Sequence, residues 1–347
     1  MKFWLIALLV VCSFADADTL IHDPSFRNGV TVAAVMPDIT GHVKHARIEG
    51  ILKPATAVDA PVWMLAQWGS GASILSQAAT ACDEGLVCRH VMSGDREQKA
   101  VVIGDGRAFD LQLRSDGLVE FSGRTPRDTP YLVKGEMWPH WLVSQPVRAR
   151  AIADYQSLTL SFEARLDVDD AQRQTGYDHS IHAARFVVAL NVKNRFTHDF
   201  LWVMLPVYDD RWPASQYGCQ KCLRGVDDEP ACSVPTTIDA PGQWQCPRDA
   251  VESDAGQVLG TSRMLFRLPS SAFVNRPLKA GDWVRHTVDL KPWLLEALKA
   301  ATGQGEAGFL YQPEDFRLAT ISIGWELSGL NRVSLSLRDL SLQGVRR

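Results

Sequence analysis

The stretch 178-DHSIHAARFVVALNVKNRFTHDFLWVMLPVYDDRW-212 decides the fold. Apolar residues occupy alternate positions over residues 182–192, while Arg185 and Asn191 fall on the other face, and this period of two predicts a β-strand. Residues 200–207 (FLWVMLPV) are apolar on both faces, so a second strand is predicted to be covered on both sides. Such a strand is expected at the centre of a sandwich, with polar residues where it ends.

The same alternation recurs along the chain. Residues 158–168 place Leu158 and every second residue after it on one face and polar residues on the other. Residues 45–52, 62–67, 107–113, 140–143, 263–268 and 283–290 also indicate strands, and residues 115–117 (SDG) are expected to turn the chain into a strand at 118–121. The spacing predicts an all-β, antiparallel, jelly-roll-like β-sandwich.

The C-terminal part predicts one helix and a closing hairpin. Residues 292–301 begin with proline, form one apolar stripe and precede Gly303, which predicts a late α-helix. Residues 328–331 then form the turn between two strands. In the first strand the residues expected to face inward are Ala319, Ile321, Ile323, Trp325 and Leu327, which leaves Glu326 on the polar face.

The N-terminus indicates export. Residues 1–17 hold Lys2, an apolar run and an A-x-A pattern at 15–17, the features of a cleaved signal peptide. Lipidation at Cys12 is the competing interpretation. The expected product is a secreted or periplasmic protein, cleaved near Ala17, with residues 18–347 forming the sandwich and an internal boundary near Arg150 left open. The apolar run is too short to span a membrane, and no later run is longer.

Charge and motifs exclude several classes of function. The net charge is -4 and there is no basic stretch, which argues against nucleic acid as a partner. The chain has no G-x-S-x-G, P-loop or dinucleotide fingerprint, so no cofactor is predicted. The oligomeric state is not predicted.

Six cysteines follow the signal peptide, an even number that favours disulfides in an exported chain. Cys82 and Cys88 close a short loop and are predicted to pair. The other four lie in an insertion at 213–260, poor in periodic pattern, where three pairings are open and a zinc site is the alternative: Cys219, Cys222, Cys232 and Cys246.

Three segments carry a resemblance: LPVYDDR at 205–211, DLKPWLLEALKAA at 289–301 and IGWELSG at 323–329. Together they are similar to a pattern of uncharacterised secreted bacterial sandwich proteins. The order of strands, late helix and final hairpin resembles the jelly-roll sandwiches of the concanavalin A-like and galactose-binding-like groups. This resemblance implies fold, export and a relation to glycans, and no activity.

The first candidate site is the run Tyr208, Asp209, Asp210, Arg211 and Trp212. Carboxylates and arginine can hold sugar hydroxyls in paired hydrogen bonds, and a flat ring can pack on a pyranose. The structural alternative is that Arg211 forms a salt bridge that fixes the loop. Calcium bound by the two aspartates is not supported by any loop motif, so no metal is predicted.

The second candidate combines His179, His182 and Arg185. His182 falls on the apolar face, which is typical of a hydrogen-bonded histidine at the edge of the core. The alternative is that His182 contacts a sugar in the same groove as Tyr208. In an enzyme, His182, Tyr208 and Arg211 would suit β-elimination by a polysaccharide lyase. The strand motifs of sandwich alginate lyases are incomplete here.

Glu326 completes the candidate residues, because a glycosidase needs two carboxyl groups and Asp209 or Asp210 could partner it. Five tryptophans are candidate sugar platforms, although most are expected in the core: Trp63, Trp68, Trp138, Trp141 and Trp244. The sequence therefore predicts an exported glycan-binding sandwich. A polysaccharide lyase or glycoside hydrolase, and a non-enzymatic envelope protein that binds another protein, remain as alternatives.

Overall fold

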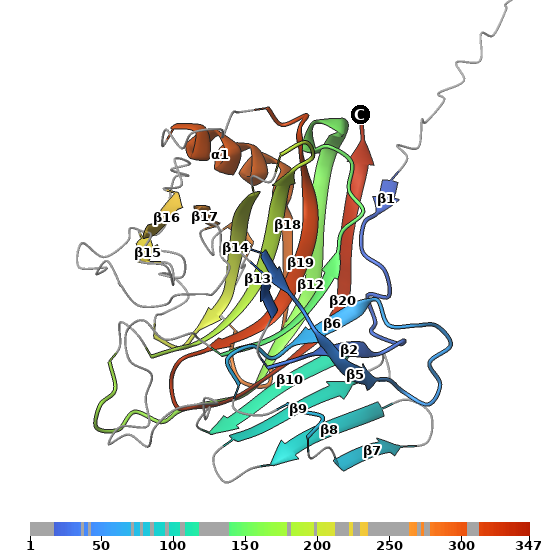
Figure 1. Ribbon diagram of the computed structural model, residues 1–347, viewed down its shortest axis with the longest axis vertical. Helices are drawn as coiled ribbons and strands as arrows, with labels where there is room; N and C mark the ends of the chain where they lie inside the picture. Colours follow the sequence, from blue (N-terminus) through green and yellow to red (C-terminus); the bar gives the residue numbers. More distant parts are fainter. Residues whose placement is uncertain are drawn as a thin grey trace, which may run out of the picture.

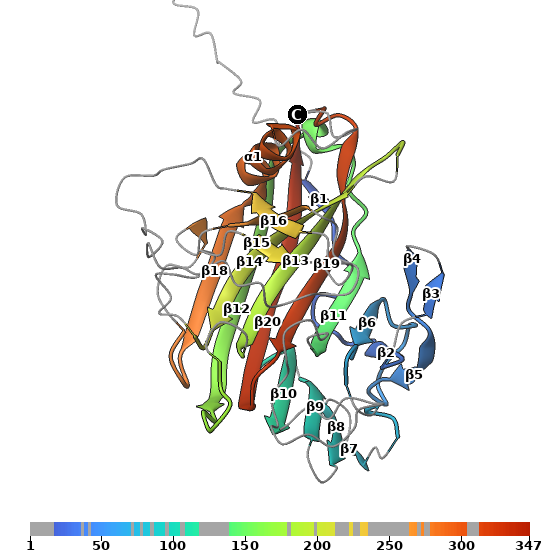
Figure 2. The ribbon, with the colours of Figure 1, turned by 60° about the vertical axis from the view of Figure 1, so that its left-hand side comes forward.

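The computed structural model describes residues 17–35, 38–40, 43–70, 73–76, 79–83, 87–93, 97–104, 108–117, 139–178, 182–197, 200–211, 222–224, 230–234, 264–268, 272–273, 278–303 and 312–347. These residues form two large β-sheets and one α-helix (Figures 1 and 2). The predicted sandwich is therefore present.

The first sheet has the strand order β18-β12-β20-β10-β9-β8-β7, with β1 also paired to β20. The bounds are β18 (Trp283–Asp289), β12 (Tyr155–Ala171), β20 (Asn331–Arg346), β10 (Leu111–Gly117), β9 (Glu97–Ile103), β8 (Val87–Ser93), β7 (Ala79–Asp83) and β1 (Ala17–Thr19). All pairings in this sheet are antiparallel.

The second sheet has the order β15-β16-β17-β14-β13-β19-β11-β6-β2-β5. The bounds are β15 (Cys222–Arg224), β16 (Pro230–Val234), β17 (Met264–Arg267), β14 (Phe200–Asp209), β13 (Ala184–Asn194), β19 (Phe316–Leu327), β11 (His140–Pro146), β6 (Trp63–Ala66), β2 (Val30–Ala33) and β5 (Ile48–Leu52). Both faces of β14 are buried from Val203 to Asp209, as its two apolar faces predicted, and its edges pair with β13 and β17. The prediction of a purely antiparallel sandwich is corrected, because β14 with β17, β16 with β17 and β2 with β6 pair in parallel. A separate hairpin joins β3 (Asp38–Thr40) and β4 (Val43–His45).

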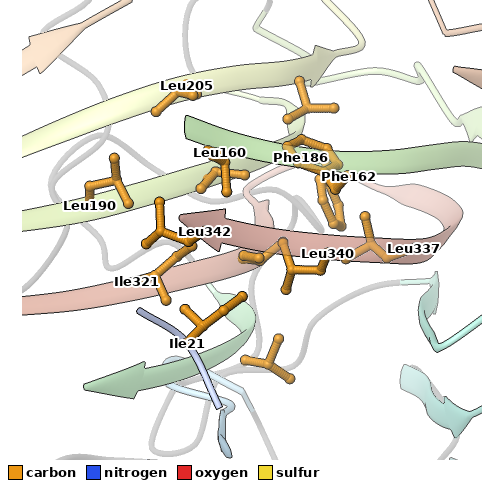
Figure 3. Packing of buried hydrophobic residues seen from close by; sticks show 14 of the residues in the cluster. Ile21, Leu160, Phe162, Phe186, Leu190, Leu205, Ile321, Leu337, Leu340 and Leu342 are labelled. Carbon is orange, nitrogen blue, oxygen red and sulfur yellow. The ribbon is translucent and has the colours of Figure 1, made fainter. Parts of the chain in front are cut away.

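The core lies between the two sheets. Leu160 and Phe162 of β12 face Phe186, Leu190 and other apolar side chains of the second sheet (Figure 3). These side chains are almost fully buried, as the alternating patterns predicted. Removing this apolar surface from water is the main favourable contribution to folding.

The helix α1 (Leu290–Gly303) follows β18 without a loop and lies across one end of the sandwich (Figure 1). The carboxylate of Asp289 accepts the backbone N–H of Lys291 at 3.1 Å, so it satisfies a helix N–H that has no partner within the helix. The apolar stripe predicted from the sequence is buried against the core: Leu294, Ala297, Leu298 and Ala301.

Three local predictions are corrected. Strand β10 continues through residues 115–117, where a turn was expected, because these residues pair with β9. In β19 a register irregularity opposite Asn191 and Val192 shifts the alternation, so Leu318 is buried and Ala319 is only half-buried. The strand expected at 45–52 is divided between β4 and β5.

Strands from before residue 150 extend both sheets, because β10 pairs with β20 and β11 pairs with β19. In the described ranges, no helix combines the length and the apolar character needed to cross a membrane. Cys82 lies opposite Cys88 in the backbone register, and Cys222 lies opposite Cys232. The cysteine side chains lie outside the described part of the chain, as do residues 1–16 and most of the 213–260 insertion.

Candidate functional site

A bulge at the end of β14 decides which way Asp209 points. Leu205, Val207 and Tyr208 all belong to the core, so two consecutive residues face inward. The register against β13 shifts at this point, where Phe186 lies opposite Tyr208 and Val187 lies opposite Pro206. A β-bulge adds one residue to a strand and so reverses the alternation beyond it. Asp209 therefore lies on the outer face of the second sheet.

Four side chains share one register position on that outer face. Arg185 of β13 lies opposite Asp209 of β14 on one side and opposite Glu326 of β19 on the other. Glu326 in turn lies opposite His140 of β11. Directly opposite residues point to the same face, about 4.8 Å apart from strand to strand. We call Asp209, Arg185, Glu326 and His140 the polar row.

Each carboxylate of the polar row is paired with a guanidinium group, Glu326 with Arg185 and Asp209 with Arg211. Arg185 Nη2 donates to Glu326 Oε2 at 2.5 Å, and His140 Nε2 lies 3.8 Å from Glu326 Oε1. Arg211 donates to both oxygens of Asp209, from Nε at 2.9 Å and from Nη2 at 2.7 Å. All five side chains are less than a tenth exposed. Two carboxylates and two guanidinium groups are thus fixed in position by one another.

The electrostatics keep Asp209 ionised. Burial by itself would raise the pKa of this carboxyl, but the charge of Arg211 and its hydrogen bonds outweigh burial and lower the pKa. Burial likewise opposes the charge of Arg211, and the neighbouring Asp209 outweighs it, so the pKa of Arg211 is raised. The Asp209 carboxylate is therefore suited to accepting hydrogen bonds and not to donating a proton.

An aromatic side chain extends the polar row beyond His140. The backbone N–H of His140 donates to the carbonyl of Trp68 at 2.7 Å, and the two rings meet edge to face with centroids 6.1 Å apart. Trp68 is half-buried. The row therefore ends in an indole ring that keeps part of its surface accessible.

Short and apolar side chains lie beside the polar row on the same face. Val187, Ala189 and Met204 form a small cluster separate from the core, with half-buried Trp202 packed against it. On the neighbouring strands β11 and β19, the hydroxyl group of Ser144 donates to the hydroxyl group of Ser322 at 2.8 Å. The outer face thus combines charged groups, hydroxyl groups and indole rings.

A second group of polar side chains lies at the end of the strands. Asp210 Oδ1 accepts the backbone N–H of Ala184 at 2.8 Å, and the Asn331 amide, with its nitrogen turned toward Asp210, lies 3.2 Å from Oδ2. Burial, followed by the charge of Asp209, raises the pKa of Asp210 to about 7. We call Asp210, Tyr177, Arg173 and His182 the rim cluster.

Arg173 and Tyr177 complete the rim cluster. Arg173 Nη2 donates to the carbonyl of Asp210 at 2.9 Å, and its guanidinium group lies 5.3 Å from the centre of the Tyr177 ring. Tyr177 lies 5.7 Å from His182, ring to ring. Burial, followed by the charge of Asp210, raises the pKa of Tyr177, so the phenol stays protonated.

The structure separates residues that the sequence placed in one groove. Tyr208 belongs to the core, 5.9 Å from Trp325, and faces away from Arg185, because the bulge leaves it inward. His182 is buried at the strand end, where its Nδ1 accepts the N–H of Asp178 at 2.6 Å. The expectation of a single groove lined by Tyr208, His182 and Arg185 is thereby corrected. His179 and Trp212 lie outside the described residues.

Arg211 forms the salt bridge that the structural alternative predicted. Of the candidate tryptophans, Trp63 and Trp141 are core residues and Trp68 borders the polar row, while Trp138 and Trp244 are outside the described ranges. Sequence reasoning missed His140, because only the pairing of β11 with β19 brings it opposite Glu326. Within the described residues, no group of three or more His, Cys, Asp or Glu could hold a metal ion.

No family model and no curated protein sequence matches the chain. Solved structures with some likeness include a thermostable cellulase derived from Cel12A of Rhodothermus marinus, at 14% identity and TM-score 0.34 over 74% of this chain and 89% of that one. A metagenome-derived family 12 endoglucanase is 14% identical, with a TM-score of 0.36 over 78% of this chain and 99% of that one. The family 11 xylanase of Neocallimastix patriciarum is 9% identical, with a TM-score of 0.31 over 77% of this chain and 100% of that one. TM-scores this low assign no function to the chain.

Proposed function

We propose that the protein binds a glycan on the outer face of its second sheet. The observation that carries this proposal is the polar row, in which Asp209, Arg185 and Glu326 from three adjacent strands are held at one register position. Ionised groups fixed in this way form directional hydrogen bonds to hydroxyl groups without losing further conformational freedom on binding.

The aromatic side chains support the same proposal. Trp68 and Trp202 border this face and are half-buried, so part of each ring is accessible. Aromatic rings with one apolar side and one polar edge suit a sugar ring, which is itself apolar on its faces and polar at its rim. A sugar lying along the row would contact an indole at one end and carboxylates further along.

Binding is better supported than catalysis. A glycosidase needs one carboxyl group that donates a proton, and such a group usually has a raised pKa. Asp209 has a lowered pKa, and Glu326 faces Arg185 and His140. Beside the polar row, the pKa of Asp210 is raised, but this carboxyl group is directed toward Ala184 and Asn331 at the strand end.

A glycan array followed by calorimetry tests this proposal. Trp68→Ala is expected to weaken glycan binding about tenfold, which corresponds to the loss of one aromatic contact. Trp283→Ala is the matched control, because Trp283 is half-buried on the first sheet beneath the guanidinium groups of Arg165 and Arg338. Equal loss in both variants, or no binding by the unmodified protein, would contradict the proposal. Release of reducing or unsaturated sugars would indicate an enzyme instead.

We also propose that the protein acts outside the cytoplasm after cleavage beside Asp18. Asp18 is held by the guanidinium group of Arg346 and accepts from the hydroxyl of Tyr155 at 3.4 Å. These contacts would anchor the first residue of the processed chain to β20. N-terminal sequencing of protein from the culture medium or periplasm is expected to begin at Asp18, and an intact Met1 would exclude export by cleavage.

A further inference from the structure

The second sheet ends at β5, which pairs with β2 on one edge and, in the described part of the chain, with no strand on the other (Figure 2). We call the edge that faces away from β2 the β5 edge. The carbonyl of Arg47 accepts the N–H of Ala34 beside β2 at 2.7 Å, so the N–H and C=O of the next residue, Ile48, point toward the β5 edge. An edge with an open row of such groups can pair with a further strand.

Apolar side chains border the β5 edge. Five large apolar side chains are exposed among the described residues, and four of them come from one stretch of chain: Ile48 at 47%, Ile51 at 54%, Val58 at 90% and Val62 at 40%. Ile48 and Ile51 belong to β5 itself. Exposed apolar surface of this kind favours contact with another molecule.

The charged side chains at the β5 edge have opposite signs. Arg47 and Glu49 are two positions apart, so they lie on the same face of the strand, and Arg47 Nη2 lies 3.4 Å from Glu49 Oε1. Edge strands that stay apart commonly carry lysines, whose like charges repel a second copy. Arg47 and Glu49 can instead each meet the opposite charge of a second copy.

The charges select one register for such pairing. Directly opposite residues point to the same face, so a strand that pairs antiparallel with its own copy is centred on one residue. A centre at Arg47 or at Glu49 brings like charges together. A centre at Gly50 places the Glu49 carboxylate opposite apolar Ile51. A centre at Ile48 places Arg47 of each copy opposite Glu49 of the other, and brings the two isoleucine side chains together at the axis.

A centre further along the strand is excluded by the backbone. Pairing around Ile51 would bring Ile48 of one copy opposite Pro54 of the other. Proline has no N–H, so it cannot donate the hydrogen bond that the open groups of Ile48 would accept there. β5 also ends at Leu52, before this residue.

We propose that two copies of the protein pair through β5, antiparallel and centred on Ile48, so that their second sheets form one continuous sheet. The partner is a second copy of this chain because the charges of Arg47 and Glu49 complement themselves in this register. The strand is short and its ion pairs are exposed, so the dimer is expected to be reversible and to dissociate at micromolar concentrations.

The pairing has a consequence for ligand binding. A two-fold axis perpendicular to the sheet keeps the outer faces of both copies on the same side, so the two polar rows would face the same way. A glycan surface could then contact both, and two linked sites bind more tightly than one. This consequence rests on the proposed function, whereas the pairing itself does not.

Sedimentation velocity over a range of protein concentrations tests the pairing. The unmodified protein is expected to shift from monomer to dimer as its concentration rises. Arg47→Glu sets two like-charge pairs across the axis and should weaken dimerisation at least about tenfold. Ile48→Glu sets two carboxylates at the axis and should have a similar effect. Because Arg47 and Ile48 are exposed, both variants are expected to fold, which circular dichroism verifies.

Mixing two variants tests the register. Arg47→Glu and Glu49→Arg should each be monomeric alone, but together they place opposite charges against each other and should form a mixed dimer. Arg317→Glu and Phe196→Glu are the matched controls, because both residues are exposed and lie outside the strands β2 and β5. These controls are expected to dimerise like the unmodified protein.

Three results would overturn the proposal. A monomer at every concentration would leave the β5 edge to a strand of another protein. A dimer that persists in both Arg47→Glu and Ile48→Glu would assign the contact to another surface. Absence of a mixed dimer, when each of the two charge variants is monomeric alone, would exclude the register centred on Ile48.

Discussion

At the scale of single residues, Glu326 lies between Arg185 and His140, which come from the two neighbouring strands. Its Oε2 accepts from Arg185 at 2.5 Å, and its Oε1 lies 3.8 Å from His140. Both Glu326 and Arg185 are nearly fully buried. A buried ion pair contributes little net stability compared with an apolar pair of the same shape, but removal of one partner leaves a charge in a medium that solvates it poorly.

Glu326→Gln is therefore expected to lower the free energy of unfolding by about 3–5 kcal/mol, because it removes the carboxylate to which the buried Arg185 donates. The double variant Arg185→Met with Glu326→Met should be less destabilised than the single variant. Urea denaturation of both proteins and of the unmodified chain measures the difference. A single variant as stable as the unmodified protein would show that the pair is solvated.

The raised pKa of Asp210 is expected to make the free energy of unfolding depend on pH. Its pKa is raised from the ordinary value of 3.8 to about 7, so the folded state favours the neutral carboxyl group. This contribution to stability is complete below pH 3.8 and is lost as the pH rises to about 7. Asp210→Asn, which stays neutral, should therefore be more stable than the unmodified protein at pH 8, by up to about 4 kcal/mol, and the gain should shrink toward pH 4. Thermal unfolding at both pH values measures it, and a gain independent of pH would contradict this assignment.

At the scale of elements, the junction of β18 and α1 depends on one side chain. Asp289 Oδ1 accepts the N–H of Lys291 in the first turn of the helix and the N–H of Leu158 on the neighbouring strand at 3.0 Å. The helix begins directly after the strand, so no loop residue could supply these acceptors. The same carboxylate thus fixes both the start of α1 and its position against β12.

Asp289→Ala is expected to destabilise the protein by about 1–2 kcal/mol, the usual effect of losing a side chain that accepts helix N–H groups. Asp289→Asn keeps an acceptor oxygen and should cost less. Guanidinium denaturation compares the two variants. If alanine and asparagine are equally destabilising, the negative charge and not the hydrogen bond stabilises this end of the helix.

At the scale of the whole molecule, the interior contains a histidine that must stay neutral. His286 is packed between Phe162, at 4.9 Å, and Phe273, at 6.1 Å, ring centre to ring centre. Burial lowers its pKa to about 4, although a hydrogen bond with the backbone of Phe273 acts in the opposite direction. The unfolded chain binds this proton near pH 6.5, while the folded chain does not.

The contribution of neutral His286 to the free energy of unfolding is therefore expected to be fully present above pH 6.5. It should fall by up to about 3 kcal/mol as the pH is lowered from 6.5 to 4. His286→Gln removes the titrating group, so its stability should be lower at pH 7 and should decline less over this range. Denaturation curves at pH 7 and pH 4.5 compare the two proteins. An equal loss of stability in His286→Gln and in the unmodified protein would show that carboxylates alone cause the acid sensitivity.

The sequence by itself determined the layers of this protein. Alternation over residues 158–168 specifies a strand with one buried face, and alternation over residues 182–192 specifies which side of that strand faces the core. The two apolar faces of residues 200–207 specify a strand that is covered on both sides. Proline at the first turn, one apolar stripe and a terminal glycine specify α1. These features are local, because a period and a terminal signal are both read within one segment.

Tertiary structure alone decided the site. The bulge at Val207 and Tyr208 reverses the alternation expected for Asp209, and a bulge is selected by its partner strand and not by the bulged segment alone. His140 and Glu326 are far apart in sequence, and only the register of β11 against β19 brings them together. Pairing between distant strands has no local signal, so the surface that carries the proposed function emerges only when the sheet is assembled.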